Sequence, residues 1–210
     1  MPALADDGLI ERIGSRLLRE PEPIGAAEGL RPDWVPETPF GRPPVAAAVL
    51  IALVRREAGI SILYTERSPE LRSHSGQIAF PGGKVDPTDR DVADAALREA
   101  AEEVGLDRAE ARVLGYLPLY YTGTNYLITP VVAVVEPKGP FIPNPGEVRS
   151  VFEVPLEYLM APGSFSTFHI KRGDREHSTW QIEHSGLVIW GITANLTRRF
   201  HDLALAAEGR

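Results

Sequence analysis

The chain has 210 residues, a formal net charge of −7 and 43% hydrophobic residues, a composition typical of a globular protein with one sizeable core. The acidic balance argues against a dedicated nucleic-acid surface, and the longest apolar run, residues 45–54, is about half a membrane span. The absence of cysteine excludes disulfides, thiol nucleophiles and cysteine-ligated zinc. We therefore expect a cytoplasmic enzyme or binding protein that contacts neither nucleic acid nor a membrane.

The N-terminal part of the chain differs from the rest in its pattern. Apolar residues with helical spacing predict a helix over residues 7–19. A stretch rich in proline and glycine, residues 21–44, follows it and favours a linker. We therefore expect an N-terminal extension over residues 1–44 and a main domain over residues 45–208.

Strands dominate the main domain. Apolar runs at 45–56 and 60–67, joined by a Glu-Ala-Gly turn, predict a β-hairpin. Further strands are expected at residues 77–81, 112–121, 127–136, 151–160 (running into a short helix), 165–172 and 178–191, and helices at 91–104 and 192–208. Trp180 and Trp190 fall in the last strand and are expected in the core. This order of elements predicts a mixed α/β domain.

The first helix of the main domain has an unusual acidic face. Glu99 and Glu103 lie one turn apart, and no Lys or Arg stands three or four positions from either of them. Arg98 is expected to pair with Asp94 and Glu102 on a second flank of the helix. Two unpaired carboxylates beside a third predict a site for a hard divalent cation, for which Mg²⁺ fits best. A solvated acidic face is the alternative interpretation.

The segment around this helix, residues 82–106, resembles the Nudix box, G-x5-E-x7-R-E-U-x-E-E-x-G-U with U aliphatic. Arg98 to Leu106 match its second half, with Ala100 at the first aliphatic position. The glycine pair, Gly82 and Gly83, is expected to form a tight turn, and the loop after it is one residue longer than in the general box. The slot of the first glutamate is therefore filled by Arg90 in strict register, or by Asp89 if the loop bulges.

The resemblance implies a Nudix-type α/β/α sandwich with a mixed β-sheet and a catalytic loop–helix–loop. It implies Mg²⁺ or Mn²⁺ as cofactor, with ligands from Glu99, Glu102, Glu103 and the carbonyl of Gly83. It also gives catalytic roles to Glu102, to Arg98, which would orient the glutamates, and to Glu147, which would complete the metal site or act as general base.

A second resemblance narrows the substrate. The segment 63-LYTERSPELRSHSGQIAFPGG-83 resembles the signature of the coenzyme A pyrophosphatase branch of Nudix hydrolases, and the similarity runs from about Ala46 to Ala204. It implies that coenzyme A (CoA) or a derivative is split into 3′,5′-ADP and 4′-phosphopantetheine. The cations expected to bind this substrate are Arg67, Arg72, His74 and Lys84.

Several alternatives stay open. A Nudix enzyme acting on ADP-ribose, NADH or another nucleoside diphosphate derivative would keep the box, and a non-catalytic Nudix-fold sensor would bind nucleotide without hydrolysis. The cations named above are also compatible with an ordinary surface. A homodimer is compatible with the sequence, whereas the isomerase of the same fold is excluded because its acid is a cysteine.

Overall fold

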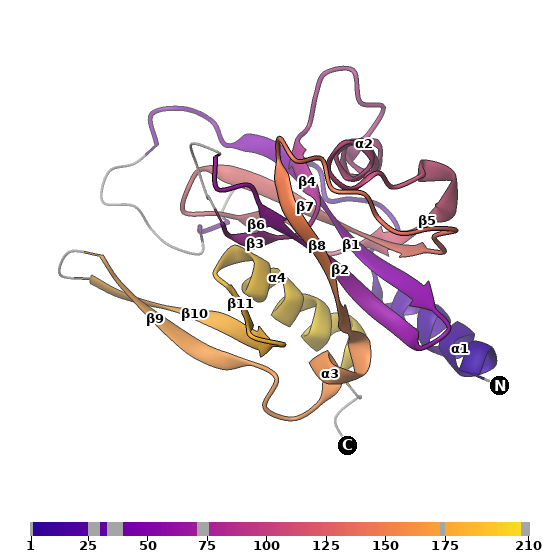
Figure 1. Cartoon of the computed structure of the whole chain (residues 1–210). Helices are drawn as coiled ribbons and strands as arrows, with labels where there is room; N and C mark the ends of the chain where they lie inside the picture. The colour runs from indigo at the N-terminus through magenta and orange to yellow at the C-terminus, as the bar shows by residue number, and fades with distance from the viewer. Residues whose placement is uncertain (1, 25–29, 33–39, 71–75, 173–174, 207–210) are drawn as a thin grey trace.

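The computed structural model describes residues 2–24, 30–32, 40–70, 76–172 and 175–206 (Figure 1). Its helices are α1 Pro2–Arg16, α2 Val92–Val104, α3 Leu156–Met160 and α4 Ile192–Phe200, with shorter helical turns at Arg108–Glu110 and His201–Leu205. Its strands are β1 Val45–Arg56, β2 Gly59–Arg67, β3 Ile78–Ala79, β4 Gly82–Lys84, β5 Ala111–Tyr116, β6 Tyr120–Tyr121, β7 Tyr126–Val135, β8 Val148–Pro155, β9 Ser166–Arg172, β10 Arg175–His184 and β11 Leu187–Trp190. None of the helices in these ranges is long and apolar enough to span a membrane.

The strands form one large mixed sheet and one small antiparallel sheet. The large sheet has the order β3-β2-β1-β7-β5, with β4 on β1, β6 on β7 and β8 on β2. Its central pair, β1 and β7, is parallel, and the other strand pairs of this sheet among the described residues are antiparallel. The small sheet, β11-β10-β9, extends away from the large one beside α4 (Figure 1).

Both faces of β1 are covered, which explains why its sequence is almost continuously apolar. Ala48, Leu50, Ala52 and Val54 belong to the core cluster that also contains the apolar residues of α2. The alternate residues Ile51 and Leu53 belong to a second cluster, which contains residues of α1, α3 and α4. The expected α/β/α sandwich with a mixed sheet is therefore confirmed.

The N-terminal helix is part of this packing. Ile10, Ile13 and Leu17 are buried in the second cluster. After the helix, Leu18 exchanges backbone hydrogen bonds with Tyr116 at 3.0 and 2.9 Å, which ties the chain to β5. Part of the Pro/Gly-rich stretch that follows lies outside the described residues, and the division of the chain at residue 44 stays a prediction.

Several predicted elements have different bounds in the structure. The first helix ends at Arg16 rather than at residue 19, because the chain leaves the helix to pair with β5. The strand expected over 112–121 is divided into β5 and β6, with Pro118 between them. The strand expected over 178–191 is divided into β10 and β11 by a tight turn at Ser185 and Gly186, whose positive φ values of 51° and 80° are typical of hairpins. The last α-helix ends at Phe200 and continues as a wider helical turn.

Candidate active site

The glycine pair before α2 forms a strand rather than a turn. The sequence predicted that the chain turns at Gly83, but Gly82 and Gly83 lie in β4, where Gly83 is the register partner of Ala48 on β1. A Cβ atom at Gly82 would lie 2.4 Å from the carbonyl oxygen of Ala48, and one at Gly83 would lie 2.4 Å from Oε1 of Glu99. The Cβ at Gly82 would collide with backbone atoms, so that position requires glycine, whereas a Cβ at Gly83 would displace the carboxylate of Glu99.

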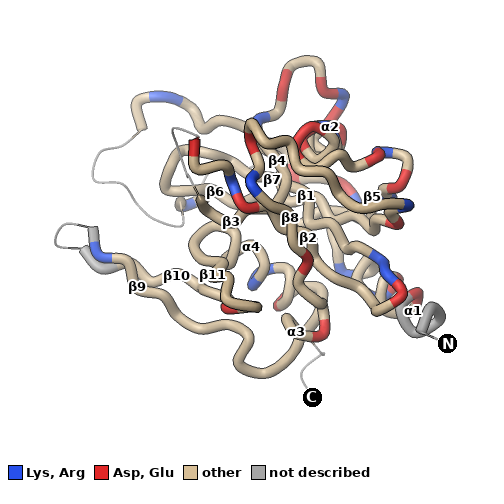
Figure 2. Tube along the Cα trace, in the orientation of Figure 1, with Lys and Arg blue, Asp and Glu red and all other residues tan. Residues whose placement is uncertain are grey.

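Helix α2 places its acidic residues against this strand. Asp91 caps its first turn by accepting a hydrogen bond from the backbone N–H of Asp94 at 2.8 Å, and Gly105 ends it in the left-handed conformation. Ala93, Ala95, Ala96 and Ala100 of α2 are buried in the core cluster that this helix shares with β1. Acidic residues gather along α2 and the loop that precedes it (Figure 2).

Glu103 lies on the buried face of α2, with only 3% of its side chain exposed. Its Oε2 accepts a hydrogen bond from the backbone N–H of Gly82 at 3.1 Å, and Nη1 of Arg67 lies 3.8 Å from its Oε1. Burial raises the pKa of Glu103 to about 7, and the neighbouring carboxylates of Glu99 and Glu147 contribute to the increase. The expectation that this carboxylate has no basic partner is therefore wrong, because Arg67 reaches it from β2.

Glu99 also has a basic partner that helical spacing did not indicate. Nη1 of Arg98, its neighbour in the sequence, donates a hydrogen bond to Oε1 of Glu99 at 3.0 Å. Glu99 is 16% exposed, and burial raises its pKa against the opposing effect of Arg98. Glu102 differs from both acids, since its side chain is 53% exposed and its Oε2 lies 3.4 Å from Nη1 of Arg98.

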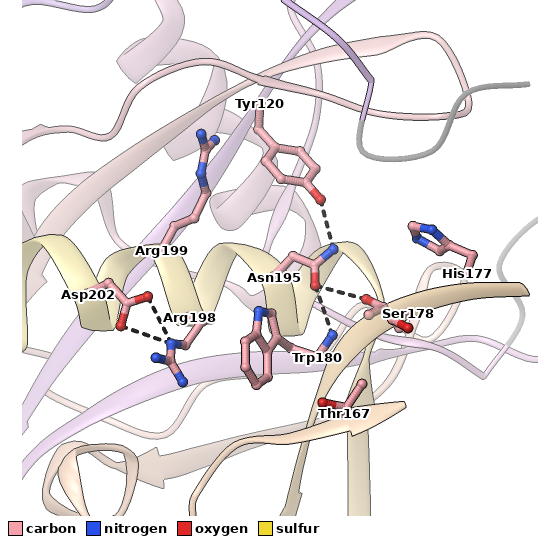
Figure 3. A pocket seen from close by; sticks show the side chains of 10 residues that line it. Tyr120, Thr167, His177, Ser178, Trp180, Asn195, Arg198, Arg199 and Asp202 are labelled. Carbon is pink, nitrogen blue, oxygen red and sulfur yellow. Dashed lines mark hydrogen bonds and ion pairs between the residues drawn. The ribbon is translucent and has the colours of Figure 1, made fainter. Parts of the chain in front are cut away.

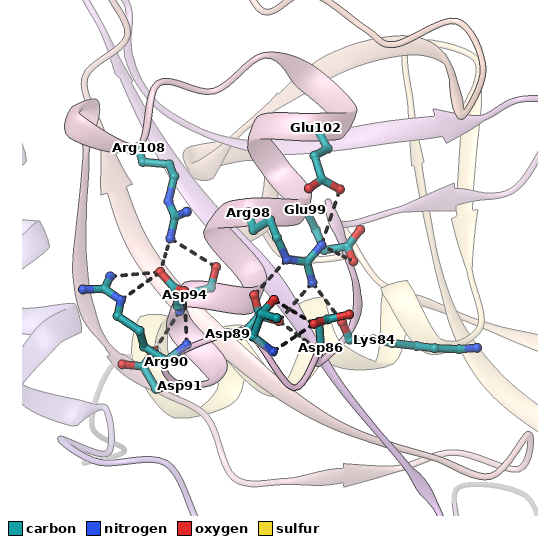
Figure 4. A network of polar contacts seen from close by, with 11 residues as sticks. Lys84, Asp86, Asp89, Arg90, Asp91, Asp94, Arg98, Glu99, Glu102 and Arg108 are labelled. Carbon is teal, nitrogen blue, oxygen red and sulfur yellow. Dashed lines mark hydrogen bonds and ion pairs between the residues drawn. The ribbon is translucent and has the colours of Figure 1, made fainter.

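The guanidinium of Arg98 is the centre of a network of hydrogen bonds and ion pairs between α2 and the loop that precedes it (Figure 4). Its Nε and Nη2 donate to the two carboxylate oxygens of Asp89 at 2.8 and 3.0 Å, and Nη2 also donates to the backbone carbonyl of Lys84 at 3.1 Å. These hydrogen bonds hold the pKa of Asp89 below its usual range. Arg98 was expected to pair with Asp94, but that acid pairs with Arg90 instead, at 2.9 Å.

Asp89 therefore fills the place of the first box glutamate in contacting Arg98, as the bulged alternative expected. The loop is held in shape by its own hydrogen bonds: Asp86 accepts from the backbone N–H and the hydroxyl of Thr88, and Asp89 accepts from the backbone N–H of Asp86. Arg90 is directed to the opposite side of the helix start, towards Asp94 (Figure 4). Motif register alone left this choice open.

A late loop brings Glu147 to the same place. Its backbone carbonyl accepts a hydrogen bond from the N–H of Ser68 at 2.8 Å, and Asn144 in the same loop donates to the backbone carbonyl of Glu103 at 2.9 Å. The half-buried side chain of Glu147 is close enough for its charge to raise the pKa of both Glu99 and Glu103. The structure thus brings Glu147 close to Glu99 and Glu103, although it is far from both of them in the sequence.

The expected substrate-binding cations have different positions. Arg67 lines a pocket of about 190 Å³ together with Gly82 and with residues of α4, to which the sequence had given no role. Its buried Nε has no hydrogen-bond partner among the described residues. Lys84 is exposed, and its side chain extends away from the Arg98 network (Figure 4). Arg72 and His74 lie outside the described residues.

Within the described ranges, no three His, Asp or Glu side chains already converge as a metal cluster. The donor set nevertheless suits a hard cation. It combines two carboxylates, whose charged forms are destabilised by burial, with a backbone carbonyl oxygen of β4. The carboxylate of Glu99 lies so close to Gly83 that a Cβ atom there would displace it. The residues present therefore fit Mg²⁺ or Mn²⁺.

Comparison with known proteins places this site in a family. Residues 43–172 match the NUDIX domain. The "Uncharacterized Nudix hydrolase NudL" of Escherichia fergusonii and that of Escherichia coli O7:K1 are each 43% identical over 159 residues, which cover 76% of this chain and 81% of theirs. Among solved structures, the Nudix hydrolase RenU of M. smegmatis aligns with a TM-score of 0.52 at 17% identity, covering 80% of this chain and 92% of that one, and so supports the fold. The chain belongs to the NUDIX domain family of hydrolases.

Proposed function

We propose that the protein is a metal-dependent diphosphatase that cleaves CoA or a CoA derivative into 3′,5′-ADP and 4′-phosphopantetheine or its acylated form. One observation carries the proposal: the buried Glu103 and the partly buried Glu99 are packed against Gly82 and Gly83, with Glu147 beside them. Burying several carboxylates together costs free energy unless a cation compensates their charge.

The residues that would hold Mg²⁺ or Mn²⁺ are Glu99, Glu103, the carbonyl of Gly83 and, by a change of side-chain rotamer, the exposed Glu102. When bound, the ion polarises the diphosphate and lowers the pKa of a water molecule. Asp89 holds the guanidinium of Arg98, and Arg98 in turn donates a hydrogen bond to the carboxylate of Glu99. Asp89 and Arg98 would therefore position Glu99 for metal binding.

Glu147 suits the role of general base. It lies on a loop that is hydrogen-bonded to Ser68, and its charge is close enough to raise the pKa of Glu99 and the pKa of Glu103. Once a divalent charge compensates the two helix carboxylates, Glu147 remains to accept a proton from the attacking water. It would keep that proton away from the phosphate oxygens during cleavage.

The choice of CoA rests on the signature over residues 63–83 and on Arg67. The buried Nε of Arg67 has no partner among the described residues, and leaving such a donor unsatisfied is costly. A phosphate of the substrate would satisfy it at the edge of the pocket of about 190 Å³. The remaining lining of this pocket is mostly apolar or hydroxyl-bearing, which suits a neutral part of the substrate, and among the described residues only Arg67 brings a charge.

The test is a panel of CoA, acetyl-CoA, dephospho-CoA, ADP-ribose and NADH, incubated with the protein and Mg²⁺, with products identified by mass. We expect 3′,5′-ADP from CoA, at a rate that falls by orders of magnitude in Glu99→Gln. Faster cleavage of ADP-ribose or NADH than of any CoA species would refute the substrate assignment. Binding of these compounds without cleavage by the wild type would instead indicate a sensor.

A further inference from the structure

A second pocket, of about 460 Å³, lies between α4 and the hairpin of β9 and β10 (Figure 3). It shares no lining residue with the pocket next to Arg67. Most of its lining comes from residues 177–202, beyond the range that matches the NUDIX domain. The volume is in the range of small-molecule sites.

One wall of this second pocket is a fixed polar network centred on Asn195. Its Oδ1 accepts hydrogen bonds from the hydroxyl of Thr179 at 2.8 Å and from the backbone N–H of Trp180 at 3.1 Å. Because a backbone N–H can only donate, the orientation of the amide is determined, and Nδ2 is directed to the hydroxyl of Tyr120 at 2.9 Å. The wall is therefore built before any ligand arrives.

The charges in the pocket leave one guanidinium without an acid. Arg198 is paired with both oxygens of Asp202 at 2.9 Å, which neutralises the carboxylate that lines the pocket. Arg199 lies over the ring of Tyr120 at 5.3 Å, and Nη1 donates to the carbonyl of Leu119 at 3.2 Å. Among the described residues no acid pairs with Arg199. The pocket therefore has a positive centre in a chain of net charge −7.

The pocket also offers an aromatic surface. Trp180 was expected in the core, but it is 36% exposed and lines the pocket. Arg198 lies over its ring at 4.6 Å and holds the indole in place. An exposed, fixed indole is a surface on which a flat ring can stack.

We propose that this pocket binds a nucleotide-sized anion: a phosphate group on Arg199 and a flat ring against Trp180. The hydroxyl and amide groups of the polar wall would contact the part of the ligand that joins its phosphate to its ring. The site is separate from the carboxylates of α2, so the inference does not depend on the diphosphatase activity.

The experiment is a calorimetric titration of the full, metal-free chain with adenosine 5′-monophosphate (AMP), with inorganic phosphate and adenosine as half-probes. We expect AMP to bind more tightly than either half-probe. Arg199→Gln should weaken AMP binding tenfold to a hundredfold, the value of one charge-assisted hydrogen bond. Trp180→Leu, at an exposed position that tolerates substitution, should weaken AMP and adenosine and leave phosphate unchanged.

Two controls separate this pocket from other effects. Arg112→Gln removes the same charge from an exposed position of β5 that does not line the pocket, and should leave AMP binding unchanged. Glu103→Gln alters the candidate active site and should also leave it unchanged. Absence of AMP binding at millimolar concentration, equal affinity in Trp180→Leu and wild type, or loss of binding in Glu103→Gln would overturn the proposal.

Discussion

Removing the charge of Glu103 should stabilise the metal-free protein at high pH. The pKa of this buried carboxyl is about 7, against an ordinary value of 4.5, which is a difference of about 2.5. At about 1.4 kcal/mol per unit, keeping the carboxylate charged in the folded state costs roughly 3 kcal/mol. Glutamine retains an oxygen that can accept the hydrogen bond from Gly82, so Glu103→Gln removes the charge with little other loss.

The sign of the pH dependence follows from the raised pKa. The stability provided by the neutral form of Glu103 is complete below about pH 4.5 and is lost as the pH rises through about 7. The wild type should therefore lose stability over this window, whereas Glu103→Gln should not. The difference in free energy of unfolding should be below about 1 kcal/mol at pH 5 and about 3 kcal/mol at pH 8.5, or roughly 6 to 12 °C in Tm.

The assay is thermal and urea unfolding of both proteins in EDTA across this pH range. Glu102→Gln is the matched control, because it removes the same charge from the same helix at a position that is 53% exposed. It should change stability by less than about 0.5 kcal/mol at either pH. Parallel pH profiles for wild type and Glu103→Gln would refute the reasoning that burial of this charge is costly.

Three further predictions concern the proposed metal ligands and the proposed substrate contact. Gly83→Ala places a Cβ 2.4 Å from Oε1 of Glu99, so kcat should fall about a hundredfold while the far-ultraviolet circular dichroism spectrum is retained; unchanged turnover would show that Glu99 need not lie against β4. Asp89→Asn weakens the support of Arg98 and should lower kcat roughly tenfold to a hundredfold in the phosphate-release assay, whereas Arg90→Gln should have no effect; equal rates in the two variants would contradict the assigned roles. Wild type should prefer CoA over dephospho-CoA by roughly tenfold to a hundredfold in kcat/KM, and Arg67→Ala should reduce this preference; a wild type without the preference would exclude the phosphate contact.

The sequence predicted the elements that build the site better than it predicted their partners. Helix α2 was predicted nearly to its ends, because its apolar residues have regular helical spacing, and in the structure Asp91 and Gly105 cap it. The ion pairs of Glu99 and Glu103 were not predicted. One comes from the neighbouring residue and the other from β2, and helical spacing indicates neither.

Other features depended on tertiary contacts that spacing does not encode. The glycine pair was predicted as a turn because a two-glycine sequence favours one, whereas pairing with β1 extends it as β4. Asp89 was left as one of two options, because only the folded loop determines which residue reaches Arg98. Trp180 was expected in the core because it falls in a strand, but its strand β10 belongs to the small sheet rather than to the large one, and the side chain is 36% exposed.

The most direct test of the account is a titration of the metal-free protein with Mn²⁺, followed by electron paramagnetic resonance of the free ion. We predict that the wild type binds Mn²⁺ and that Glu99→Gln and Glu103→Gln each weaken this binding at least tenfold. Arg149→Gln, which removes an exposed positive charge from β8, should not weaken it. The same Mn²⁺ affinity in the wild type, Glu99→Gln and Glu103→Gln would contradict the assignment of the metal to α2.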